Sequence, residues 1–169
     1  MKAARALRGA VVVVVAALAL GLSGCASADT AAIVDGHRIS ERDAQEAARQ
    51  IQQAQPDSGL DTPNAVSSLI MAQFINAVAD KAGKGLSDSA AREAVQTIED
   101  PSPATLELVK ASVAWNNLSS DERSQAVDEA QKAKITINPR YGTFDAKNLK
   151  FDTSKPDWIK PEPTQTSAG

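Results

Sequence analysis

Cysteine and histidine are nearly absent from this chain, since among 169 residues each occurs once, as Cys25 and His37. A single cysteine excludes a disulfide within the chain, and one cysteine with one histidine cannot supply the ligand set of a zinc site. A Ser-His-Asp triad would have to use His37, and the chain contains no Gly-x-Ser-x-Gly motif. We therefore expect no enzyme activity, no metal and no cofactor.

An excess of basic residues is also missing. The chain has 18 Lys and Arg against 21 Asp and Glu, which gives a net charge of −3. Removing Lys2, Arg5 and Arg8 with the N-terminal segment described next would lower the net charge from −3 to −6. An acidic chain without a Lys/Arg cluster argues against nucleic acid as a partner. It also argues against attachment to a membrane by electrostatic attraction.

Long apolar runs are absent except at the N-terminus, where residues 10–20 are apolar throughout. Lys2, Arg5 and Arg8 precede this run, and no acidic residue occurs before Asp29. A basic start, a short apolar run and small residues after it are typical of a secretory signal peptide. The alternative is a transmembrane anchor, but the run is shorter than the roughly 20 residues that span a bilayer. We predict a signal peptide over residues 1–24.

The signal ends in Leu22-Ser23-Gly24-Cys25, which resembles the lipobox of bacterial lipoproteins. The small residues before Cys25 suit the cleft of lipoprotein signal peptidase, and the cysteine sulfur accepts a diacylglycerol. Stable anchoring takes two fatty chains or more, palmitate among them, and a diacylglyceryl group meets that need. We expect Cys25 to become the lipidated first residue, on the extracytoplasmic face of the cell membrane. Residues 25–30 are then a short tether.

The mature chain has room for one domain with tails, which we place at residues 31–151. Start and stop signals predict five helices, beginning with caps at Ser40, Thr62 and Ser87. The third helix is expected to turn four apolar side chains inward, those of Ala91, Ala94, Val95 and Ile98. The fourth helix is expected to be well buried, because its apolar stripe is wide and includes Leu108 and Trp115. The expected helices are residues 40–55, 87–99 and 103–118, a second helix from Thr62 to Gly83 or Gly85, and a fifth helix from a cap at Ser119 or Ser120 to Lys134.

Two short β-branched or apolar segments flank these helices, residues 32–34 before them and residues 135–137 after them. An Asp35-Gly36 turn follows the first segment, as in hairpins with type I′ turns. Neither segment is long enough to persist alone, so we expect the two to pair. The predicted fold is a mainly α compact bundle of about five helices, with a two-stranded sheet formed by the N- and C-terminal strands. Proline and polar residues predict a disordered tail over residues 152–169.

Six stretches recur in an order found in a known family, namely residues 33–36, residues 39–40 with Asp43, and residues 69–70, 79–83, 86–88 and 138–145. In this order and spacing they resemble the N-terminal domain of SurA/PrsA-type extracytoplasmic foldases. The resemblance implies a helical module with paired terminal strands that binds unfolded or partly folded exported proteins. Full foldases usually add a parvulin domain whose active site has two histidines, for which this chain has no place, so we expect binding without isomerase activity.

The resemblance assigns no binding residue, so candidates for client contact come from chemistry alone. Trp115, Tyr141 and Phe144 are the candidates, because aromatic side chains supply large apolar contact areas. The alternative is that these aromatics pack in the core or anchor the C-terminal segment. The expected function is a chaperone-like lipoprotein, and the runner-up is an accessory envelope lipoprotein with one fixed protein partner. A third hypothesis is a lipoprotein that binds a small molecule for a transporter, but the chain is too small for two lobes around a ligand cleft.

The lipobox leads to a direct test. Replacing Cys25 with serine (Cys25→Ser) removes the sulfur that accepts the diacylglycerol, so we expect an unlipidated, uncleaved precursor. Mass spectrometry of the purified protein measures both changes. An unmodified Cys25 in the wild-type protein would contradict the lipoprotein prediction.

Overall fold

The computed structural model describes residues 29–145, 147–148 and 150–152. The predicted signal peptide, the lipidation site Cys25 and residues 153–169 of the predicted tail lie outside the described residues. Within the described part of the chain, no helix combines the length and the apolar character needed to cross a membrane.

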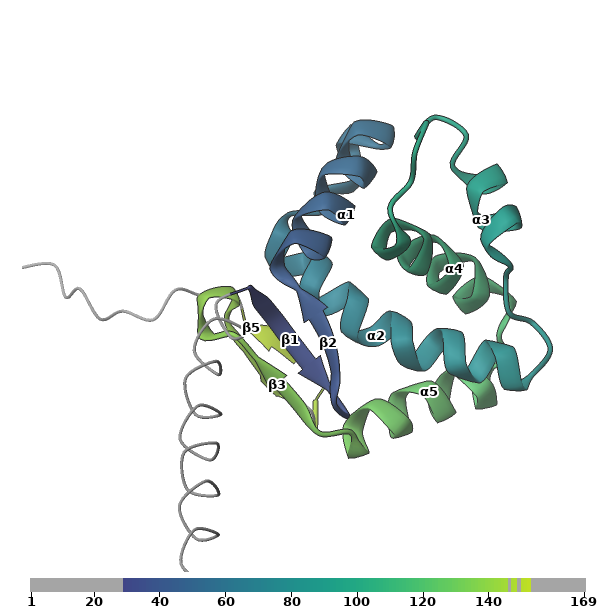
Figure 1. Cartoon of the computed structure of the whole chain (residues 1–169). Coiled ribbons are helices and arrows are strands. Elements are labelled where there is room, and N and C mark those ends of the chain that lie inside the picture. The colour runs from purple at the N-terminus through teal and green to yellow at the C-terminus, as the bar shows by residue number, and fades with distance from the viewer. Residues whose placement is uncertain (1–28, 146, 149, 153–169) are drawn as a thin grey trace, which may run out of the picture.

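The described part of the chain is mainly helical, as predicted, with five α-helices and two small antiparallel sheets. Helices α1 to α5 gather on one side of the three-stranded sheet, and α2 runs through the middle of the group (Figure 1). The helices are α1 Glu41–Ala54, α2 Thr62–Lys81, α3 Asp88–Ala94, α4 Pro103–Asn117 and α5 Ser120–Lys132, with short 3-10 helices at Pro56–Ser58 and Pro139–Tyr141. The strands are β1 Thr30–Val34, β2 His37–Ser40, β3 Ile135–Ile137, β4 Thr143–Asp145 and β5 Lys150–Asp152.

The predicted pairing of the two terminal segments is confirmed. Strand β3 lies antiparallel to β1, with Ala32 opposite Ile137 and Val34 opposite Ile135. The sheet has one strand more than predicted, because β2 pairs with the other edge of β1 across the Asp35-Gly36 turn. Asp35 has φ 48° and Gly36 has φ 88°, as expected for a type I′ turn.

Hydrogen bonds at both ends of β3 hold its register on β1. Near the Asp35 turn, the backbone N–H of Asp35 donates to the Lys134 carbonyl (3.0 Å) and the N–H of Lys134 donates to Asp35 Oδ1 (2.8 Å). At the other end, the Asn138 N–H donates to the Ala31 carbonyl (2.8 Å) and Asn138 Nδ2 to the Thr30 carbonyl (3.1 Å). A one-residue slip would break these bonds and turn the buried side chains outward.

Each α-helix begins at a side chain that accepts a backbone N–H, the standard N-cap arrangement. Ser40 and Ser87 cap α1 and α3 as predicted, and Ser119 forms a full capping box with Glu122. The prediction for α2 was wrong by one residue, because Asp61 Oδ1 accepts the Asn64 N–H at 2.8 Å and Thr62 already lies in the helix. The carboxylate of Asp61 also suits the positive end of the helix dipole.

Helix α3 is shorter than predicted. It ends at Ala94, and turns and bends replace its expected last five residues. Ala91 is buried as expected, but Ala94 is exposed. Helix α3 packs chiefly on α4, which leaves a continuation beyond Ala94 without a second apolar surface to stabilise it.

The main core lies between the sheet and helices α2, α4 and α5. Val34 of β1 and Val66, Ile70 and Val78 of α2 are almost fully buried. Phe74 is the largest side chain on the buried face of α2 and is 8% exposed. A smaller cluster, formed by Ala91, Leu106 and Val109, joins α3 to α4.

The core position of Phe74 gives a stability prediction. The Phe74→Ala variant should lose about 3–5 kcal/mol of unfolding free energy, the usual cost of emptying a buried aromatic site. Chemical denaturation followed by circular dichroism measures the loss. Phe144→Ala is the matched control, because Phe144 is only half-buried in β4. Equal losses in the two variants would contradict the core placement of Phe74.

Candidate functional site

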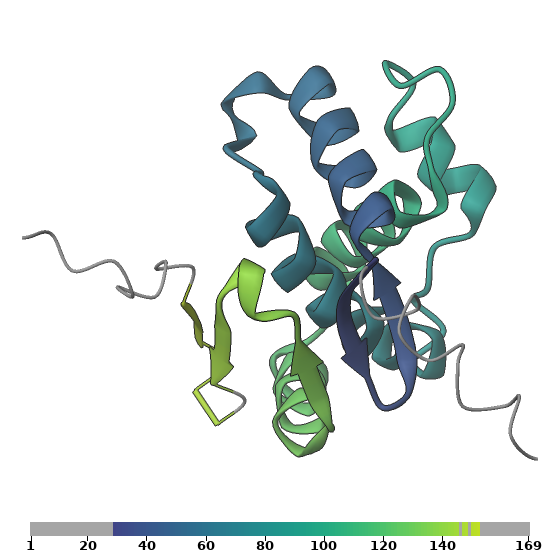
Figure 2. The same cartoon turned by 60° about the vertical axis from the view of Figure 1, so that its left-hand side comes forward.

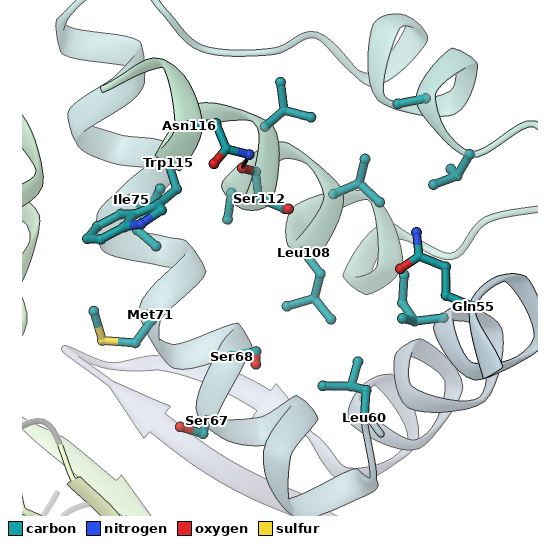
Figure 3. A pocket seen from close by; sticks show the side chains of 16 residues that line it. Gln55, Leu60, Ser67, Ser68, Met71, Ile75, Leu108, Ser112, Trp115 and Asn116 are labelled. Carbon is teal, nitrogen blue, oxygen red and sulfur yellow. Dashed lines mark hydrogen bonds between the residues drawn. The ribbon is translucent and has the colours of Figure 1, made fainter. Parts of the chain in front are cut away.

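A groove of about 690 Å³ opens between the end of α1 and helices α2, α3 and α4 (Figure 3). None of the sixteen residues that line it is charged. Five lining residues have neutral polar side chains, namely Gln55, Ser67, Ser68, Ser112 and Asn116. The other eleven are apolar, and Leu60, Met71, Ile75, Leu108 and Trp115 are among them. Such a lining favours an apolar ligand that also offers a few hydrogen-bonding groups.

The buried amide of Gln50 holds α1 to the start of α4. Its Nε2 donates to the Asp100 carbonyl (3.0 Å) and to the Glu46 carboxylate (2.7 Å). Its Oε1 accepts the Ser102 N–H (2.9 Å) and the Thr105 hydroxyl (2.6 Å). All four hydrogen bonds that a side-chain amide can make are therefore formed. This network sets the separation of the helices on two sides of the groove.

Further polar contacts hold α2 and α3 to α4. Asn76 of α2 donates through Nδ2 to the side chain of Glu107 (2.8 Å) and to its carbonyl (3.2 Å). Lys110 of α4 pairs with Asp88 of α3 at 2.5 Å and with Glu107 at 2.9 Å. The hydrogen bond from Lys110 lowers the pKa of Asp88, and the bonds to Asp88 and Glu107 raise the pKa of Lys110. The pair consequently stays charged at neutral pH.

Trp115 lies at the end of the groove beside Ile75 (Figure 3) and is half-buried. The guanidinium carbon of Arg123, from α5, lies 5.4 Å from the centre of the indole ring. Arg123 Nε also donates to the Trp115 carbonyl (2.8 Å), and Arg123 Nη2 donates to the Asn116 carbonyl (3.3 Å). Arg123 thus caps the end of α4 and holds the indole by a cation–π contact.

The structure separates the three aromatic candidates for client contact. Trp115 lines the groove. Tyr141 belongs to the main core, where it is 7% exposed, and Phe144 packs on Phe151 in the β4–β5 hairpin, with ring centres 6.5 Å apart. Figure 2 shows this hairpin as a separate unit next to β3. Of the three, only Trp115 can meet a ligand in the groove.

Most residues of the groove were not predicted from the sequence. The wide apolar stripe on α4 was expected to be well buried, but Leu108 and Trp115 are half-buried. The stripe is wider than the surface that α2 and α3 cover, so its remainder faces the groove. The width of this stripe was the one feature of the sequence that could have indicated an exposed apolar wall on α4. Leu60 lies in the loop before α2 and carried no recognisable signal in the sequence.

Comparisons with protein-family models, with curated proteins and with solved structures gave no match to this chain. The resemblance to the foldase domain therefore remains a prediction. His37 is exposed at the start of β2. Within residues 29–145, 147–148 and 150–152, no three His, Cys, Asp or Glu side chains are grouped so that they could hold a metal ion.

The Gln50 network predicts a large effect of one buried polar side chain. Gln50→Leu keeps the apolar stem but leaves the Ser102 N–H without its acceptor and removes one of the two side-chain partners of the Thr105 hydroxyl, which keeps Ser102 Oγ at 2.9 Å. At about 1–3 kcal/mol for a buried group left unpaired, we expect a loss of about 1–3 kcal/mol in unfolding free energy. Denaturant titration measures this loss.

Gln52→Leu is the matched control, because Gln52 is exposed on the same helix. An exposed substitution of this kind should change stability by less than about 0.5 kcal/mol. If the two variants melt alike, Gln50 does not tie α1 to α4.

Proposed function

We propose that this protein is a lipid-anchored extracytoplasmic chaperone-like binder of unfolded or partly folded exported proteins, without isomerase activity. Its clients bind in the groove between α1, α2, α3 and α4. The observation that carries the proposal is the charge-free, mainly apolar lining of that groove. The signal-like N-terminus and Cys25 support its place on the outer face of the membrane.

An uncharged apolar groove suits a binder of many different proteins. Apolar contact is non-directional and grows with the area removed from water, so one groove can accept many apolar sequences. Charged pairs, in contrast, set the register and select one partner. The runner-up function is a lipoprotein with one fixed partner, and such a protein would be expected to bind through a flat surface patch rimmed by charged residues. The lining of the groove supports the first function over the second.

The groove is also accessible from solvent, as client binding requires. Leu60 and Trp115 are half-buried and Gln55 is exposed, so these side chains keep surface that a client segment can cover. Covering apolar surface contributes roughly 25 cal/mol per Å². Several half-buried side chains together can therefore hold an unfolded segment weakly and reversibly, which suits a holdase.

The proposal predicts the effect of a charge placed in the groove. Leu60→Glu puts a carboxylate among apolar side chains and requires it to lose water when a client binds. Leu60 belongs to neither core cluster, so the fold should persist. The assay measures how much of the protein halves the aggregation of a chemically unfolded secreted protein. We expect the variant to be needed at about ten times the wild-type concentration, which corresponds to a loss of about 1.4 kcal/mol in binding free energy.

The matched control is Ile33→Glu. Ile33 is an apolar side chain 40% exposed on β1 and away from the groove, and its cross-strand neighbour Arg38 can pair with the new carboxylate. Light scattering should show that this variant protects the client as well as the wild type does. Equal protection by Leu60→Glu and wild type would contradict binding in the groove.

A further inference from the structure

Sulfur is scarce in this chain, and one of its few sulfur atoms belongs to the wall of the groove. The sequence contains two methionines, Met1 and Met71, and the single Cys25. Met1 lies in the predicted signal peptide, so Met71 would be the only methionine of the mature protein. Met71 lies on α2 and lines the groove. Oxidation of a methionine in the mature protein would therefore change the groove.

Met71 lies toward the Trp115 end of the groove. Its side chain packs against the main core but is only half-buried, so it keeps surface that solvent can reach. Ile75 follows Met71 by one turn on the same face of α2, and Ile75 lies beside Trp115 (Figure 3). A partly exposed methionine is open to small dissolved oxidants in the folded chain.

The chemistry at Met71 requires a peroxide and no other reactant. The sulfur lone pair attacks one peroxide oxygen, the O–O bond breaks and an S–O bond forms. The sulfur gives up two electrons and becomes a sulfoxide, while hydrogen peroxide is reduced to water. The thioether is apolar, whereas the sulfoxide is polar and accepts hydrogen bonds. Methionine sulfoxide reductases return the sulfoxide to the thioether, so the change is reversible.

A sulfoxide has a large effect in this groove because the lining offers it few partners. None of the sixteen lining residues is charged, and eleven of them are apolar. A client segment that covers the sulfoxide takes water from its oxygen and brings an apolar side chain in return. Burying a polar group without a hydrogen bond is unfavourable, so the oxidised groove binds apolar segments more weakly.

We infer that Met71 is a redox modification site of the groove. Peroxide converts its thioether to a sulfoxide, and the sulfoxide weakens client binding until a reductase removes the oxygen. The effect on clients rests on the proposed function and adds its regulation, whereas the oxidation of Met71 does not depend on that function.

Treatment of the full-length protein with hydrogen peroxide tests the inference. The oxidant is removed by gel filtration before an untreated, chemically unfolded secreted protein is added, so the client itself is not oxidised. Mass spectrometry of peptides should place one added oxygen on Met71 and none on Trp115. Peptides are measured because a lipidated Cys25 also carries a thioether. We expect equal protection of the client to require about five to thirty times more oxidised than untreated protein, the effect of one unpaired polar group.

Met71→Leu is the matched control, because leucine keeps the apolar character and approximate volume of methionine but has no sulfur. This variant should protect the client like the untreated wild type, both before and after peroxide. Met71→Gln places a permanent neutral amide in the same position and should weaken protection without any peroxide. Sulfoxide reductases with dithiothreitol, followed by removal of the reductant, should restore the oxidised wild type. Circular dichroism shows whether each protein is folded.

The outcomes separate the inference from the proposed function. An unmodified Met71 after peroxide, a sulfoxide that leaves protection unchanged, or a Met71→Leu variant that peroxide inactivates would overturn the inference and leave the proposed function standing. Loss of the circular dichroism signal on oxidation would also overturn it, because the cause would then be unfolding. An untreated wild-type protein that protects no client would overturn both the proposed function and the regulation, whatever the peptides show.

Discussion

The arrangement of the groove depends on one buried side chain, Gln50. An amide inside an apolar interface is costly unless its hydrogen bonds are complete, and Gln50 completes all four. Because three of its four partners are Asp100, Ser102 and Thr105, the amide ties the middle of α1 to the cap and first turn of α4. Apolar packing alone would permit these helices to slide, since it is non-directional. The directional bonds of Gln50 set one spacing, and that spacing leaves the groove open.

Local signals were sufficient for much of the fold. Helix caps and tight turns depend only on neighbouring residues, so the caps at Ser40 and Ser87 and the Asp35-Gly36 turn could be predicted from the sequence. The pairing of β1 with β3 followed from the shortness of both segments. The N-cap of α2 was misplaced because Asp61 and Thr62 are both good caps and only the backbone geometry decides between them. The β4–β5 hairpin was missed because it depends on contacts such as the Phe144–Phe151 pair.

The candidate site was much harder to predict than the fold. Its walls come from segments far apart in the sequence, from Ile51 at the end of α1 to Asn116 at the end of α4. An apolar residue at a helical spacing has the same pattern whether a neighbour or a ligand covers it. Leu108 was therefore assigned to the core, and Trp115 was left open between core packing and client contact. The proposed anchor adds a geometric limit. Cys25 precedes Thr30, the first residue of β1, by five residues, which span at most about 18 Å. A lipid on Cys25 would therefore keep the start of β1 close to the membrane.

The central claim is that unfolded proteins bind in the groove, and site-specific photo-crosslinking tests it most directly. Benzoylphenylalanine replaces Leu60 in the groove or Gln125 on the exposed face of α5, and each protein is irradiated with a reduced and alkylated secreted protein. The native form of that secreted protein serves as the folded control. The account predicts crosslinks from position 60 to the unfolded client, few to its native form, and few from position 125. Equal crosslinking from the two positions, or crosslinking from position 60 that does not distinguish the unfolded client from the native one, would contradict it.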